Sequence, residues 1–134
     1  MIRIFASVFA SALLTFTSVP QSRASNSADL GFELSRQLCS RCHVIGEYNR
    51  MGGIGNSPSF TWMVKSSDWR ERFLTFYSRR PHPVFTRVPG YALWSDVPPY
   101  YPPFKITRDE IDLIVAYVET LRTSQQHVDL LWRE

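Results

Sequence analysis

The sequence lacks three features that would assign it to a common structural class. Only two cysteines, Cys39 and Cys42, occur in 134 residues, and a disulfide between them would close a loop too short to restrain the chain. No stretch alternates polar and apolar residues with period two, and no internal repeat is visible, so nothing indicates a sheet protein or a solenoid. Beyond residue 24, no apolar run is long enough to span a bilayer.

The first 24 residues have the pattern of an export signal. Arg3 precedes a mostly apolar run over residues 4–19, and small residues near the end suit cleavage after Ala24. We therefore expect residues 1–24 to be a cleaved signal peptide and residues 25–134 to form one periplasmic domain. An uncleaved membrane anchor is the alternative, but serines and threonines interrupt the run, and a span needs about 20 predominantly apolar residues.

Charge is almost balanced along the chain but unevenly distributed. There are 15 basic and 12 acidic residues, and removal of the two arginines of the predicted leader leaves 13 against 12, a net charge of +1. This gives no general case for nucleic-acid binding. Two hypotheses stay open for the basic segment over residues 65–87: a solvated helix face, or a surface for an acidic partner or for anionic groups of a cofactor. Its charged residues are Lys65, Arg70, Arg72, Arg79, Arg80 and Arg87, with Asp68 and Glu71.

The two cysteines belong to a chemical motif. Residues 39–43 read C-S-R-C-H, the C-x-x-C-H attachment pattern of c-type haem. Two thiols three positions apart on one helical turn can both reach the vinyl groups at one porphyrin edge, and the next imidazole then points at the iron. A thioredoxin-like pair needs a βαβ context, and a zinc site needs four ligands. The motif therefore predicts one haem c, bound covalently by Cys39 and Cys42, with His43 on the iron.

Helical patterns account for most of the remaining chain. A Thr-x-x-Glu capping box at Thr107 predicts a helix that begins at Arg108, and Arg122 suits its C-terminal end. Asp68 begins a second predicted helix with an aromatic face. The first helix is expected over about residues 28–42.

These segments resemble the small class I c-type cytochromes. Gly31, eight residues before Cys39, matches the glycine at which the terminal helices of that family cross. The loop "GNSPSF" is similar to the family loop, which implies that the Pro58 carbonyl orients the haem-binding histidine. The resemblance implies an all-α, cytochrome c-like fold with three to four short helices around one haem. The family-like core covers about residues 28–122, and residues 123–134 form a tail.

The usual sixth iron ligand of the family is absent. A methionine is expected in a Met-Pro-x-Phe context, but the chain reads Y-P-P-F from Tyr101. The resemblance therefore places Tyr101 over the distal haem face, presented by the proline-stiffened loop 97–104. Four hypotheses stay open: ligation by tyrosinate, a protonated tyrosine beside an open iron, replacement by a distant residue, and a tyrosine that only packs at the haem edge. The candidates for replacement are His82, Met63 and Met51.

The resemblance also implies a function. We expect an electron carrier rather than an enzyme, which passes single electrons at an exposed haem edge to a redox protein partner. The basic segment would assist docking, and the potential would be low if Tyr101 binds iron. The alternative is a haem protein that binds or senses small ligands, or performs peroxidase-like chemistry, through an open sixth position. A subunit of a larger dehydrogenase or oxidase complex is a further alternative.

Overall fold

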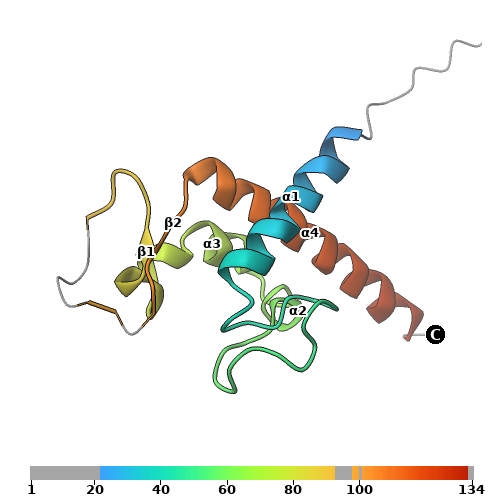
Figure 1. Ribbon diagram of the computed structural model, residues 1–134. Helices are drawn as coiled ribbons and strands as arrows, with labels where there is room; N and C mark the ends of the chain where they lie inside the picture. The colour runs from blue at the N-terminus through green and yellow to red at the C-terminus, as the bar shows by residue number, and fades with distance from the viewer. Residues whose placement is uncertain (1–21, 93–97, 100, 133–134) are drawn as a thin grey trace, which may run out of the picture.

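The computed structural model describes residues 22–92, 98–99 and 101–132 (Figure 1). Most of the predicted signal peptide, residues 1–21, lies outside this part of the chain. The described residues are mostly helical, with short 3-10 turns and strands in the middle of the chain. The elements are α1 (Ser22–Leu38), α2 (Phe60–Met63), α3 (Trp69–Leu74), η1 (Phe76–Ser78), η2 (His82–Val84), β1 (Thr86–Arg87), β2 (Phe104–Lys105) and α4 (Arg108–Leu131).

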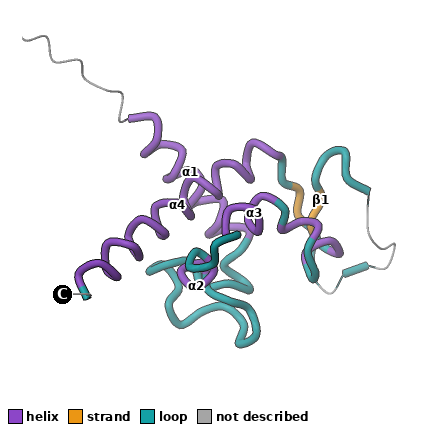
Figure 2. The backbone as a smooth tube through the Cα atoms, turned by 180° about the vertical axis from the view of Figure 1, so that it is seen from behind, coloured by secondary structure: helices purple, strands orange, loops and turns teal. Residues whose placement is uncertain are grey.

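The terminal helices cross at Gly31, as the sequence predicted. Figures 1 and 2 show α1 lying across α4. A Cβ atom at Gly31 would lie 1.9 Å from the Leu113 carbonyl oxygen and 3.0 Å from Tyr117 Cβ, so only glycine allows the two backbones to approach this closely. The Phe32 and Tyr117 rings pack edge to face beside the crossing, with centroids 5.3 Å apart. The crossing fixes the end of α1, from which the cysteine motif follows.

The first helix differs from its predicted range at both ends. It begins at Ser22, inside the predicted leader segment, and ends at Leu38 rather than continuing to Cys42. The motif itself forms a tight turn, in which the His43 N–H and the Cys42 N–H both donate to the Cys39 carbonyl, at 2.9 and 3.1 Å. The turn redirects the chain immediately after the helix.

The last helix begins as predicted and ends later. The Thr107 hydroxyl accepts from the Glu110 N–H at 3.2 Å, and the Glu110 carboxylate accepts from the Thr107 N–H at 2.7 Å, which confirms the capping box. The helix then runs for 24 residues to Leu131, because residues 123–131 contain neither glycine nor proline to stop it. The expectation of only short helices was therefore wrong for α4.

The predicted role of Arg122 at the end of the last helix was also wrong, since the helix continues beyond it. Its guanidinium instead donates to the carbonyls of Val64 and Ser66, the latter at 3.4 Å. The same group lies 5.7 Å from the Trp69 ring centre. Arg122 thus fastens the connection between α2 and α3 to the middle of α4.

A small parallel sheet corrects the all-α expectation. Strands β1 and β2 pair with Thr86 opposite Phe104. The Phe104 N–H donates to the Phe85 carbonyl at 2.9 Å, and the Ile106 N–H donates to the Arg87 carbonyl at 3.0 Å. Pairing satisfies backbone groups that would otherwise need water or side chains. It ties the segment before α4 to the segment after η2.

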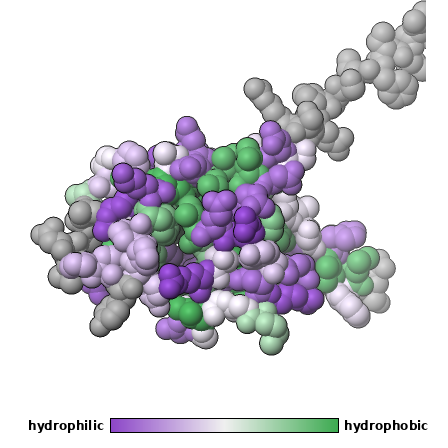
Figure 3. Space-filling model, viewed as in Figure 1, coloured by the Kyte–Doolittle hydropathy of each residue, from purple (hydrophilic) through white to green (hydrophobic). Residues whose placement is uncertain are grey.

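The apolar core lies where α1, α2 and α3 meet α4. Its least exposed members, at 0–1% exposure, are Ile45, Val64, Ile106, Ile111 and Val118. Hydrophobic side chains also reach the surface at the C-terminal end of α4 (Figure 3), where Leu130 and Leu131 are exposed. Among the described residues, no helix combines the length and the apolarity that a membrane crossing needs.

Candidate functional site

A cavity of about 880 Å³ lies between the cysteine turn and the segment from α3 to η2. Pockets for small molecules and cofactors occupy about 300–1,000 Å³ and are mostly apolar with a few polar groups. This cavity has that character, because apolar, aromatic and proline residues make up most of its wall. Its lining includes Leu38, Cys39, Cys42, His43, Pro58, Phe60, Met63, Phe73, Phe76, His82, Phe85, Pro98, Pro99, Tyr101, Phe104 and Ile114.

Both cysteines of the motif face this cavity as free thiols. Burial raises the pKa of the Cys39 thiol to about 12, and the neighbouring Cys42 adds to the rise. The protonated thiol of Cys39 is therefore favoured. Both thiols lie where an apolar group in the cavity could be attached to them.

The His43 ring is oriented by the loop that follows the motif. Its Nδ1 lies 2.8 Å from the Pro58 carbonyl oxygen, the contact that the family resemblance implies. An Nδ1–H that donates to a backbone carbonyl leaves Nε2 free to bind metal, the usual arrangement for a ligating histidine. The Phe60 ring packs beside the imidazole at 5.7 Å, and the Phe60 N–H donates to the Val44 carbonyl at 3.0 Å. The loop is therefore fastened to the motif at Pro58 and at Phe60.

Asn49 is a positioning residue that the sequence did not reveal. Its side chain accepts from the Ile45 N–H at 2.6 Å and donates to the carbonyls of Ser40 and His43, at 3.1 and 3.0 Å. One amide thus satisfies three backbone groups of the motif turn. Asparagine is common in loops for many reasons, so the residue type alone gave no signal.

Gly53 brings the same loop back against the motif. Its φ of +77° is in the left-handed region, and a Cβ atom there would lie 3.1 Å from the Cys42 carbonyl oxygen and 3.2 Å from the Val44 nitrogen. The next residue, Ile54, donates its N–H to the Cys42 carbonyl at 3.0 Å. Together with Asn49, this contact supports the backbone of the motif.

On the opposite wall, His82 faces the motif histidine. The two ring planes are parallel within 7° and their centroids are 6.0 Å apart. His82 packs against Phe76 at 5.2 Å and Phe85 at 5.6 Å, and its Nδ1 lies 3.1 Å from the Arg79 carbonyl oxygen. Burial lowers the pKa of His82, the Arg79 carbonyl opposes this, and His43 lowers it further. The neutral imidazole is therefore favoured.

Tyr101 lies at the rim of the cavity. Its side chain is 40% exposed, with the Arg41 guanidinium 4.9 Å from its ring centre and the Phe85 ring at 6.5 Å. Of the predicted alternatives, Met63 lines the cavity as His82 does. Residues 97 and 100 of the proline-rich loop lie outside the described part of the chain.

Three arginines of the basic segment also border the cavity, namely Arg72, Arg79 and Arg80. Arg72 pairs with Asp68 at 2.7 Å, and Arg79 pairs with Glu71 at 3.0 Å. The acidic residues of the segment therefore offset part of its positive charge. Contact between these arginines and anionic groups of a cofactor stays a prediction.

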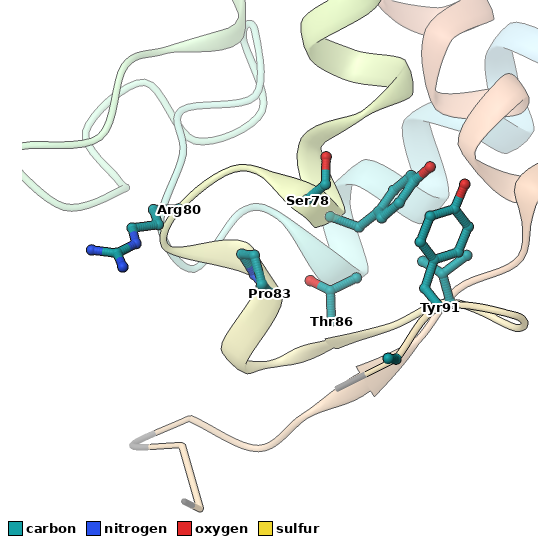
Figure 4. A pocket seen from close by; sticks show the side chains of 8 residues that line it. Ser78, Arg80, Pro83, Thr86 and Tyr91 are labelled. Carbon is teal, nitrogen blue, oxygen red and sulfur yellow. The ribbon is translucent and has the colours of Figure 1, made fainter. Parts of the chain in front are cut away.

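A second, smaller cavity of about 410 Å³ lies beside the first. Figure 4 shows Arg80 pointing away from Thr86 and Tyr91. Among the described residues, the lining of this smaller cavity contains no cysteine or histidine, whereas Cys39, Cys42, His43 and His82 line the larger one. The lining residues are Tyr77, Ser78, Arg80, Pro83, Thr86, Val88, Tyr91 and Ala92.

Comparison with known proteins points to the same class as the motif. Cytochrome c-552 of Bradyrhizobium diazoefficiens is 26% identical to the chain over 110 residues, which cover 82% of this chain and 89% of that protein. No protein-family model and no solved structure matches the chain. The chain is thus a distant relative of a c-type cytochrome. Its four described α-helices, with α1 packed on α4, are consistent with a cytochrome c-like fold.

Proposed function

We propose that this chain is a c-type cytochrome that carries single electrons between redox proteins. One observation carries the proposal: both thiols and the histidine of the motif line one apolar cavity of cofactor size, and the Pro58 carbonyl holds His43 with Nε2 free. Covalent haem would be held there by Cys39 and Cys42, with His43 on the iron. When bound, haem supplies one-electron chemistry, and the protein supplies ligation and burial.

Three residues around the motif hold the proposed iron ligand, His43, in one orientation. Asn49 and Gly53 hold the turn, and Pro58 fixes the tautomer and the direction of the His43 ring. A ligand positioned by its surroundings before electron transfer has little to rearrange when the charge on the iron changes. This rigid support suits a one-electron carrier.

We also propose a cellular compartment for the chain and the kind of redox protein that it contacts. The export pattern over residues 1–24 and the need to attach haem outside the bacterial cytoplasm favour a periplasmic location. We infer docking of an acidic redox protein at the rim near Arg79 and Arg80. Since Glu71 pairs with Arg79, the attraction is modest, and binding should weaken as salt rises.

Covalent attachment tests the proposal directly. The full chain, with its own N-terminus, is expressed in a bacterium that attaches haem c, and periplasmic protein is run on a denaturing gel and stained for haem. The wild type and the control Ser40→Ala should keep haem through denaturation, while the double variant Cys39→Ala/Cys42→Ala should lose it. A redox titration of the wild type should follow a single one-electron transition. A wild-type chain without covalent haem, or one that does not cycle reversibly, would contradict the proposal.

A further inference from the structure

His43 and His82 reach the same cavity from opposite walls. His43 follows the cysteine turn at the end of α1, whereas His82 begins η2, and the two are 39 positions apart in the sequence. Their rings are nevertheless parallel within 7°, with centroids 6.0 Å apart. Aromatic rings in contact have centroids about 4.5–7 Å apart, so this separation fits either an offset-stacked pair or two rings with an atom between their nitrogens.

We propose that His82 is the second axial ligand of the haem iron, so that the iron is held between two histidines. The assignment rests on the proposed function, because it requires haem at the motif. Metal–imidazole bonds are about 2 Å long and each ring nitrogen lies about 1 Å from its ring centre, so two ligands on one metal have centres about 6 Å apart. The separation between His43 and His82 equals this span.

The hydrogen bonds of both rings support this assignment. The Nδ1 atom of His43 is engaged by the Pro58 carbonyl at 2.8 Å, and the Nδ1 atom of His82 by the Arg79 carbonyl at 3.1 Å. In each ring Nε2 is therefore the nitrogen left for metal. A ligating histidine almost always donates its other N–H to such an acceptor.

The segment around His82 is built to hold one ring orientation. The Phe76 and Phe85 rings pack against the imidazole at 82° and 61°. The Arg79 carbonyl accepts from the backbone N–H of His82 at 3.0 Å as well as from the ring. Pro81 and Pro83 flank the residue and restrict its backbone. Little side-chain entropy remains to be lost on binding iron.

Under this proposal Tyr101, the leading candidate from sequence, takes a different role. It is 40% exposed, and its ring lies 4.9 Å from the Arg41 guanidinium of the motif and 6.5 Å from the ring centre of Phe85 in the cavity wall. Tyr101 therefore links the motif to Phe85 at the edge of the site.

Ligation by two histidines changes what the site can do. Methionine opposite histidine raises the potential of a cytochrome c, so two imidazoles give a lower potential. A protein-supplied sixth ligand also closes the position that small molecules would use. Both consequences favour electron transfer at low potential over the sensing and peroxidase-like alternatives.

The test uses ferric haem-loaded protein and compares His82→Ala with Tyr101→Phe, the variant of the competing candidate, and with the control His127→Ala on the exposed part of α4. Low-temperature electron paramagnetic resonance reports the spin state of the iron, and near-infrared spectra report the ligand type. The wild type, His127→Ala and Tyr101→Phe should be low-spin with two nitrogen ligands. His82→Ala should be high-spin, should return to low-spin on addition of imidazole, and in the reduced state should bind carbon monoxide much faster than the wild type.

A low-spin His82→Ala spectrum equal to the wild type would overturn the assignment, as would conversion to high spin by Tyr101→Phe alone or a high-spin wild type. If His82→Ala fails to fold, His82→Met decides instead. That variant should show a sulfur–iron band and a higher potential, and an unchanged spectrum and potential would reject His82. Haem staining separates the two proposals: covalent haem with the wrong ligand refutes only this one, while absence of covalent haem refutes both.

Discussion

Gly31→Ala should destabilise the protein although alanine is the better helix former. The substitution adds one methyl group at the crossing of α1 and α4, where its carbon would lie 1.9 Å from the Leu113 carbonyl oxygen and 2.6 Å from the Leu113 carbonyl carbon. Both atoms belong to the backbone of a long helix, so no side-chain rotation can relieve the overlap. The two helices would have to separate.

The expected size follows from two opposing effects. In a helix interior, alanine is favoured over glycine by about 0.5–1 kcal/mol. Restoring a contact of about 3.4 Å requires the backbones to part by about 1.5 Å, which loosens the surrounding core, and overpacking of this kind costs about 1–3 kcal/mol or more. Because the clash is with backbone, the upper end of this cost applies. After the gain in helix propensity, the free energy of unfolding should fall by about 2 kcal/mol. Total stabilities are about 5–15 kcal/mol.

Urea unfolding of the haem-loaded protein, followed by far-ultraviolet circular dichroism, measures this loss. Gly55→Ala is the matched control, because a Cβ atom at Gly55 meets nothing within 4 Å. The control should be neutral or slightly stabilising, while Gly31→Ala should shift the midpoint to lower urea with an unchanged slope. Equal free energies of unfolding for the two variants would refute the close crossing of the helices.

Two further predictions concern the motif loop and α3. Asn49→Ala leaves three backbone groups without their partner, so it should lower the free energy of unfolding by about 2 kcal/mol and reduce the haem content. The control is Asn26→Ala, at an exposed position of α1. Equal haem contents and equal free energies of unfolding for the two variants would contradict this prediction. The Arg72 guanidinium and then the Ser66 hydroxyl lower the pKa of Asp68 to about 2. The stability that the Asp68 carboxylate contributes is fully present above the pKa of aspartate in the unfolded chain, about 3.9, and it is lost as the pH falls through about 2. The urea midpoints of Asp68→Asn and of the wild type should therefore lie closer together at pH 2 than at pH 5. A difference between the two midpoints that stays the same at both pH values would refute this.

Several local features could be predicted because the signal lies within a few residues. The capping box at Thr107 depends only on side chains that reach their own helix end. The C-x-x-C-H spacing predicts a cavity-facing turn because the three ligand groups come from one stretch of five residues. The crossing glycine was predicted through the family resemblance, and its contact with Leu113 confirms it.

Other features depend on contacts between distant segments and left no local signal. The end of α4 was misjudged because Arg122 suits a helix end by charge, whereas its partner is the Val64 carbonyl, 58 positions away in the sequence. The parallel strands are too short to show a period. Asn49 acts through three backbone groups that only the folded turn brings together.

The sequence by itself determined the chemistry of one wall of the site: two thiols and a histidine on a single turn. The opposite wall was decided by the tertiary structure. Family likeness predicted Tyr101 on that wall. The folded chain from α3 to η2 also brings the ring centre of His82 to 6.0 Å from that of His43. The physical reason is that local spacing fixes groups only within one turn, whereas the distance between two walls depends on how helices and loops pack around the space between them.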